Sequence, residues 1–226
     1  MLDLNKKLEF VTRQIREAEM QFGRVANSVE LLLVSKAQPL EKIQAAYDAG
    51  QRKFGENYLQ EALPKIEALE KLAIEWHFIG RLQSNKTTEI AEHFAWVHSV
   101  ASLKIAQRLN AARPYHLPPL NICLQVNISH EASKAGVKEA ELFDLAAAIQ
   151  PLKQLKLRGL MCVPENLVDF DSQFAAFKCV ADLQQALIKQ GFELDTLSMG
   201  MSQDFPAAIK AGSTLVRIGT AVFGPR

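Results

Sequence analysis

The sequence predicts one parallel (β/α)₈ barrel over residues 1–226, with an extra helix at its N-terminal end. Strand-like apolar runs alternate with amphipathic helical stretches until eight strands have appeared, a pattern typical of right-handed crossovers and a parallel sheet. The run Leu31–Ser35 is apolar on both faces, as expected for a strand covered on both sides. Eight such units in about 200 residues fit a small closed barrel. An open doubly wound sheet is the alternative, but no Gly-x-Gly-x-x-Gly motif follows the first strand.

The extra helix is predicted by apolar residues spaced by three and four positions, which form one buried stripe. These residues are Leu4, Leu8, Val11, Ile15, Ala18 and Phe22. Few residues follow the eighth strand, so the eighth outer helix is expected to be short or missing. We expect the N-terminal helix to cover part of that gap.

The predicted strands are Leu31–Ser35, Arg52–Gly55, Ile74–Ile79, Trp96–Val100, Asn121–Ile128, Leu157–Val163, Leu194–Met199 and Leu215–Ile218, the last running on through Phe223. The predicted helices between them are Leu40–Gly50, Ala62–Leu72, Glu89–Phe94, Ser102–Asn110, Lys138–Ile149, Phe170–Gln190 and Ala207–Ala211.

Composition narrows the class of protein. The formal net charge is +1, which suggests no nucleic-acid or anionic-membrane partner, and no apolar run is long enough to span a bilayer. Cys123, Cys162 and Cys179 are odd in number and lack the spacing of metal ligands. The composition therefore predicts a reduced, cytoplasmic protein.

The first candidate for chemistry is Lys36, which follows the first strand. Active sites of these barrels lie at the carboxyl ends of the strands, so Lys36 is expected at the mouth of the barrel. One interpretation is that its amine simply reaches solvent along an apolar stem. The other is that burial favours the neutral amine, which can attack a carbonyl and form a Schiff base.

Two further groups follow the seventh and eighth strands, where this fold usually binds phosphate. Gly200 is followed by Ser202, and Gly219 by Thr220. Glycine lets backbone N–H groups approach a phosphate closely, and the hydroxyls add donors. The glycines could instead only shape turns, and Ser202 could only cap a helix. Both groups together, opposite Lys36, favour a ligand with a phosphate and a carbonyl.

Three other residues are weighed in the same region. Arg217 alternates with apolar neighbours, so it should face the barrel interior or its mouth, either paired with a buried carboxylate or directed at a ring nitrogen. His77 is more often a hydrogen-bonded core residue than a ligand contact. Met199 is expected to fill a gap in packing.

Several motifs together resemble the YggS/PROSC family of pyridoxal phosphate homeostasis proteins, which is related to the barrel domain of alanine racemase. The motifs are Val34–Lys36, Phe54–Asn57, Trp76–Gly80, Gln83–Lys86, Gly159–Met161, Leu197–Ser202 and Arg217–Thr220. The resemblance runs nearly end to end. It implies that Lys36 carries pyridoxal 5′-phosphate (PLP) as an aldimine. It also implies that Arg217 faces the pyridine nitrogen, that Ser202, Gly219 and Thr220 bind the phosphate, and that Asn57, His77 and Met199 complete the cofactor site.

Three functions remain open at this point. The first is a PLP carrier for cofactor homeostasis with little or no turnover, whose partners are PLP and PLP-dependent apoenzymes and which is expected to be a monomer. The second is a PLP-dependent amino-acid racemase. The racemases that this barrel resembles take a tyrosine from a second domain of the partner subunit, and this chain is expected to lack that domain. The third is a barrel aldolase that uses the Lys36 amine without a cofactor.

Overall fold

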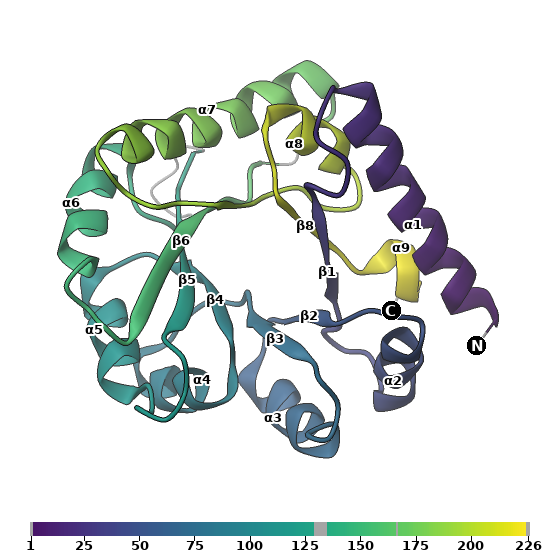
Figure 1. Ribbon diagram of the computed structural model, residues 1–226, viewed down its shortest axis with the longest axis horizontal. Coiled ribbons are helices and arrows are strands. Elements are labelled where there is room, and N and C mark those ends of the chain that lie inside the picture. The colour runs from purple at the N-terminus through teal and green to yellow at the C-terminus, as the bar shows by residue number, and fades with distance from the viewer. Residues whose placement is uncertain (1, 129–134, 166, 225–226) are drawn as a thin grey trace.

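The chain forms a closed barrel of eight parallel strands in sequential order, with helices around the outside (Figure 1). This computed structural model describes residues 2–128, 135–165 and 167–224. The strands are β1 (Glu30–Val34), β2 (Lys53–Glu56), β3 (Glu75–Phe78), β4 (Trp96–Val100), β5 (Leu120–Gln125), β6 (Leu155–Met161), β7 (Thr196–Ser198) and β8 (Leu215–Ile218). The predicted barrel is confirmed, including its extra helix.

The helices follow the strands around the barrel. They are α1 (Leu2–Gln21), α2 (Leu40–Asp48), α3 (Leu59–Ala68), α4 (Thr87–His93), α5 (Leu103–Ala112), α6 (Glu139–Ile149), α7 (Phe170–Lys189), α8 (Phe205–Ala211) and α9 (Thr220–Phe223), with a 3₁₀ turn η1 (Ser84–Lys86) before α4. Within the described residues, no helix combines the length and apolar character needed to cross a membrane.

Closure of the barrel depends on β1, which pairs with β2 on one side and with β8 on the other. Leu32 lies opposite Arg217 in the β1–β8 register. Neighbouring residues of a parallel pair point to the same face, and side chains alternate along a strand. Val34 therefore lies on the same face as Leu32 and Arg217, and Lys36 begins the turn that follows this strand.

Helix α1 packs against α2, α8 and α9, where a full eighth outer helix would lie (Figure 1). Its residues Leu8, Val11, Ile15 and Ala18 are buried. Glu19 near its end accepts hydrogen bonds from the backbone N–H groups of Val29 (2.7 Å) and Asn27 (3.1 Å), which ties α1 to the start of β1. The prediction that α1 covers this gap is confirmed.

Some boundaries differ from the predicted ones. The apolar run after Ile218 does not continue β8, because residues 220–223 turn into the short helix α9. Strand β5 ends at Gln125 instead of Ile128, and α3 begins at Leu59 instead of Ala62. Apolar runs are shared by buried strands and buried helices, so their ends are the least determined feature of the sequence.

Candidate functional site

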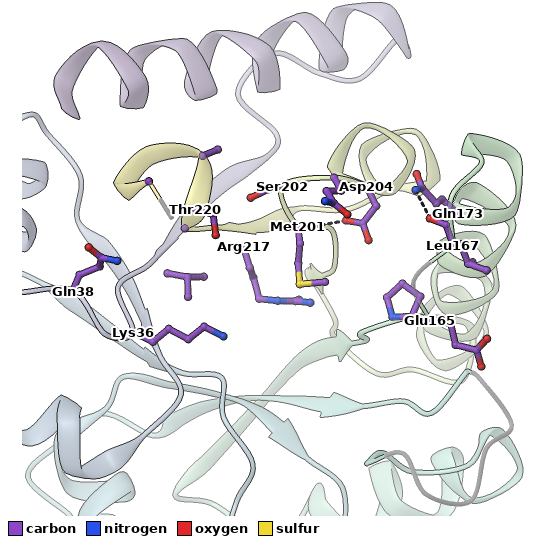
Figure 2. A pocket seen from close by; sticks show the side chains of 16 residues that line it. Lys36, Gln38, Glu165, Leu167, Gln173, Met201, Ser202, Asp204, Arg217 and Thr220 are labelled. Carbon is purple, nitrogen blue, oxygen red and sulfur yellow. Dashed lines mark hydrogen bonds between the residues drawn. The ribbon is translucent and has the colours of Figure 1, made fainter. Parts of the chain in front are cut away.

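A cavity of about 560 Å³ opens at the carboxyl ends of β1, β6, β7 and β8 (Figure 2). Its walls include Lys36, Gln38, Pro164, Glu165, Gln173, Met201, Ser202, Gln203, Asp204, Arg217, Gly219 and Thr220. Five of the eight predicted site residues therefore meet here: Lys36, Ser202, Arg217, Gly219 and Thr220. The volume is typical of a small-molecule site, about 300–1,000 Å³.

Lys36 lies two residues beyond β1, with Val34 lining the same cavity. Figure 2 shows its side chain extending toward Arg217 rather than out along the surface. Because β1 ends at Val34, this direction is set by the turn that begins at Lys36 and not by strand alternation. The structure thus favours the interpretation of Lys36 as a residue of the cavity over that of a solvent-directed lysine.

Helix α3 holds the backbone on both sides of Lys36. The ammonium of Lys65 donates to the carbonyl oxygen of Ser35 at 2.9 Å, and the N–H of Ala37 donates to Glu61 Oε2 at 3.0 Å. Ala37 has a φ of 57°, an unusual value for a residue with a Cβ. Lys65 and Glu61 were not among the predicted site residues, although their spacing of four residues places both on one face of the helix.

Lys65 also pairs with Glu56 in a buried ion pair of 2.8 Å. Glu56 is fully buried and accepts a second bond from the hydroxyl of Ser35 at 2.6 Å. Burial raises the pKa of Glu56, while its hydrogen bonds to Lys65 and Ser35 oppose that shift. Its other oxygen, Oε2, has no hydrogen-bond partner among the described residues. The pair lies directly behind the turn that carries Lys36.

Two loops place hydrogen-bond donors on the opposite wall. Ser202 and Gln203 lie in a turn that is closed by bonds between Met201 and Asp204, and Thr220 opens α9. Among the described residues, the backbone N–H groups of Ser202, Gln203, Thr220 and Ala221 donate to no other protein group. Unpaired N–H groups beside two hydroxyls form a suitable environment for an anion such as a phosphate.

The glycines of these loops also have packing reasons. A Cβ on Gly219 would lie 2.7 Å from the carbonyl oxygen of Val34, so β8 can approach β1 this closely only at a glycine. Gly200 has a φ of +96°, and its Cβ would lie 2.7 Å from that of Ala208. The structural interpretation of both glycines therefore holds, whether or not they also contact a ligand.

Arg217 reaches the cavity from β8 and is almost completely buried. Its Nη1 donates to the carbonyl oxygen and to the hydroxyl of Ser198, the latter at 2.8 Å, and Nη2 donates to the carbonyl oxygen of Cys162 at 2.8 Å. Burial lowers the pKa of Arg217, but guanidinium groups stay charged in proteins. Within the described residues it forms no ion pair with a carboxylate. Part of its donor capacity remains for a ligand.

The other three predicted residues do not line this cavity. Asn57 follows β2, and its Oδ1 is buried without a partner among the described residues. Met199 is fully buried in the hydrophobic core, where a gap-filling side chain was expected. His77 lies in the barrel interior, where its ring stacks on Trp96 and bonds to Glu75 and His98. The predicted contacts of these three residues with a cofactor ring stay predictions.

Comparison with known proteins gives the family. Residues 12–226 match the alanine racemase N-terminal domain. The chain is 54% identical to the pyridoxal phosphate homeostasis protein of Vibrio cholerae, with 100% of this chain and 98% of the relative covered. The chain belongs to the pyridoxal phosphate homeostasis protein family. The predicted resemblance is confirmed.

Solved structures place the chain within this family. PipY of Synechococcus elongatus, solved with PLP bound, is 37% identical and matches with a TM-score of 0.82 over 93% of this chain and 100% of PipY. The alanine racemase of Clostridium difficile matches with a TM-score of 0.78 but is only 13% identical, and only 60% of its chain is covered. The homeostasis proteins therefore share the barrel with racemases, while sequence similarity separates the two groups.

Proposed function

We propose that this chain binds PLP at Lys36, holds it, and delivers it to other proteins, with little or no catalytic turnover. The observation that carries the proposal is that Lys36 faces Arg217 and two donor-rich loops within one cavity. The relatives named as PLP homeostasis proteins, and PipY with PLP bound, support the same ligand for this family.

Each wall of the cavity suits a different part of such a ligand. Bound PLP supplies an aldehyde that condenses reversibly with primary amines. Lys36 provides the amine, on a side chain that is half-buried and lines the cavity. Ser202, Gly219 and Thr220 are proposed to bind the phosphate through hydroxyl and N–H groups. Arg217 is proposed to donate to the pyridine nitrogen.

The remaining predicted residues take lesser parts in the proposal. Asn57 has a buried amide oxygen without a partner among the described residues and follows the strand next to β1, so we propose it as a further contact of the cofactor ring. Met199 and His77 are enclosed in the barrel. We therefore propose that Met199 packs beneath the site and that His77 acts from within the barrel.

The racemase alternative is less well supported. Relatives such as the one 54% identical to this chain are named as homeostasis proteins, whereas the racemase, at 13% identity, shares the fold. A guanidinium cannot accept a proton, so Arg217 would keep the pyridine nitrogen unprotonated and the cofactor a weak electron sink. No tyrosine is found among the described residues that line the cavity.

The attachment site is tested by trapping. Wild-type protein incubated with PLP should show a visible absorbance band, and borohydride reduction should fix the cofactor to the peptide that contains Lys36. Lys36→Ala should lose both signals, whereas Lys104→Ala, which removes an exposed lysine of α5, should keep them. Trapping on another lysine in the wild type would refute the assignment. Absence of any band would instead favour the aldolase without a cofactor.

A second experiment separates carrier from racemase. Loaded protein is incubated with L-amino acids in D₂O, and exchange at Cα is followed by NMR. Racemisation requires an acid/base group on each face of the substrate carbon. Exchange at about 1 s⁻¹ or faster, abolished by Lys36→Ala, would overturn the carrier function in favour of the racemase.

The proposal also covers the partners and the state of the protein. We propose a cytoplasmic monomer that transfers PLP to PLP-dependent apoenzymes. Light scattering after gel filtration tests the monomer, with a dimer mass as the contradicting result. Mixing the loaded protein with an apoenzyme tests delivery, and the apoenzyme should gain activity. Protein reduced with borohydride holds the cofactor through a C–N single bond that does not exchange, so it should activate none of the apoenzyme and serves as the control.

A further inference from the structure

A continuous chain of hydrogen-bonded side chains crosses the barrel interior from Arg217 to Glu75. Arg217 Nη1 contacts Ser198 Oγ at 2.8 Å, and Ser198 Oγ contacts His98 Nδ1 at 2.8 Å. His98 Nε2 then contacts His77 Nδ1 at 2.9 Å, and His77 Nε2 contacts Glu75 Oε1 at 2.9 Å. The residues come from β8, β7, β4 and β3. These hydrogen-bonded side chains join the cavity at the carboxyl ends of the strands to the opposite end of the barrel.

The far end of this chain opens on a second cavity of about 360 Å³, which His77 helps to line. Glu75 is the first residue of β3 and has a side chain that is 37% exposed. Between the two cavities, Ser198, His98 and His77 are 0–1% exposed. The three inner members are therefore sealed from solvent, and only the two ends carry charge.

With neutral rings, the carboxylate of Glu75 allows only one arrangement of protons. An ionised carboxylate only accepts, so His77 carries its proton on Nε2 and donates to Glu75. His77 Nδ1 then accepts from His98 Nε2, and His98 Nδ1 accepts from the hydroxyl of Ser198. The same hydroxyl accepts from Arg217, which can only donate. Burial lowers the pKa of both histidines, and the hydrogen bond to His77 lowers the pKa of Glu75 to about 2, in agreement with neutral rings and an ionised carboxylate.

Such a chain is an unusual use of a barrel core. Layers of branched apolar residues fill these interiors without any need for hydrogen bonds, whereas every buried polar group must be matched. Here the two histidines and the serine each accept one hydrogen bond from the side of the guanidinium and donate one toward the carboxylate. Arg217 has no carboxylate partner of its own among the described residues. The hydrogen-bonded chain and two carbonyl groups therefore determine where its guanidinium lies.

We propose that Ser198, His98 and His77 are positioning residues that fix the orientation of Arg217 toward the cavity, and thereby set the affinity and the absorbance spectrum of bound PLP. This inference rests on the proposed function. None of the three residues lines the cavity, so they would act only through Arg217. This also gives His77 a role compatible with its burial.

Ser198→Ala is the sharpest test because it removes one oxygen and leaves the backbone carbonyl contact to Arg217 in place. The matched control is Ser213→Ala. Ser213 is equally buried, but its hydroxyl bonds only to the carbonyl groups of Leu197, Met199 and Leu215. We expect Ser198→Ala to weaken PLP binding about tenfold and to shift the absorbance band. Ser213→Ala should lower the melting temperature and change neither. Ser198→Thr retains the hydroxyl and should show the same absorbance band as the wild type.

Two further measurements keep the result interpretable. His98→Phe interrupts the chain in its middle while keeping an aromatic ring, and should match Ser198→Ala in affinity and spectrum. In protein without PLP, ¹⁵N NMR should show both histidines as neutral Nε2–H tautomers, with His98 Nδ1 shifted by Ser198→Ala.

The outcomes separate this inference from the proposed function. If wild-type protein fails to bind PLP, the function is wrong and the positioning role falls with it. If wild-type protein binds PLP, and Ser198→Ala and His98→Phe bind it with unchanged affinity and spectrum, only the positioning role is wrong. A protonated or Nδ1–H histidine in the wild type would refute the hydrogen-bonded chain itself.

Discussion

Replacing Lys65 by methionine should expose how strongly the turn before Lys36 depends on the buried pair of Lys65 and Glu56. Methionine retains most of the stem of the side chain and removes the ammonium. The carboxylate of Glu56 then keeps only the hydroxyl of Ser35 as a partner, and the carbonyl of Ser35 loses its bond from Lys65. Breaking a buried pair from one side typically costs about 3–5 kcal/mol.

Protonation of Glu56 sets an upper limit on the part of this cost that comes from the unpaired carboxylate. An unpaired buried carboxylate can take up a proton, which costs about 1.4 kcal/mol per unit of pH above its ordinary pKa of 4.5. That limit is about 3.4 kcal/mol at pH 7 and about 1.4 kcal/mol at pH 5.5. The pKa of Glu56 is already raised in the wild type, so the carboxylate part of the loss should lie below these values.

The sign of the pH dependence follows from the same argument. A carboxyl whose folded pKa is raised stabilises the fold fully below its unfolded pKa and loses that contribution as the pH rises through the folded pKa. Lys65→Met removes a group that lowers the pKa of Glu56, so the variant should lose more stability at pH 8 than at pH 5.5.

Urea unfolding of wild-type protein, Lys65→Met, Glu56→Gln and the double variant measures these terms as a thermodynamic cycle. The double variant should recover much of the loss, because no unpaired charge remains. A loss below about 1 kcal/mol at pH 8, or a loss that does not change with pH, would refute the reasoning.

Three further outcomes are expected. Gly200→Ala should destabilise the fold by about 2–4 kcal/mol in urea unfolding, because the φ of +96° disfavours a residue with a Cβ and that Cβ would lie 2.7 Å from the Cβ of Ala208. Adding Ala208→Gly should recover only the part of the loss that comes from this contact. Full recovery would show that the backbone angle costs nothing. Glu75 has a folded pKa of about 2, so its contribution to stability is present above pH 4.5 and is lost as the pH falls toward 2. Glu75→Gln should therefore make the melting temperature less dependent on pH over that range. An unchanged dependence would contradict the pairing with His77. Iodoacetamide at pH 8 should label exposed Cys179 in native protein, whereas Cys123 and Cys162, whose thiol pKa burial raises to about 12, should react only after unfolding, as peptide mass mapping will show.

The sequence alone determined the architecture and brought five residues of the candidate site to the right end of the barrel. Alternating apolar strands and amphipathic helices are local patterns, and each can be read without knowing its neighbours. The position of Lys36 at a strand end, and of Ser202 and Thr220 after the last two strands, follows from the same patterns plus the rule that sites lie at the carboxyl ends of barrel strands. Met199 as a packing residue could also be predicted, because a methionine beside an apolar strand rarely needs another explanation.

The tertiary structure alone decided which polar groups meet inside the barrel. His98 and Ser198 are separated by 100 residues, and their contact depends on how four strands are staggered around a closed sheet. The pair of Glu56 and Lys65 likewise depends on the angle at which α3 packs on β2. Hydrophobic periodicity says which face of an element is buried, but not which buried side chain lies opposite. That choice depends on register, tilt and closure, which belong to the whole barrel rather than to any one stretch of its sequence.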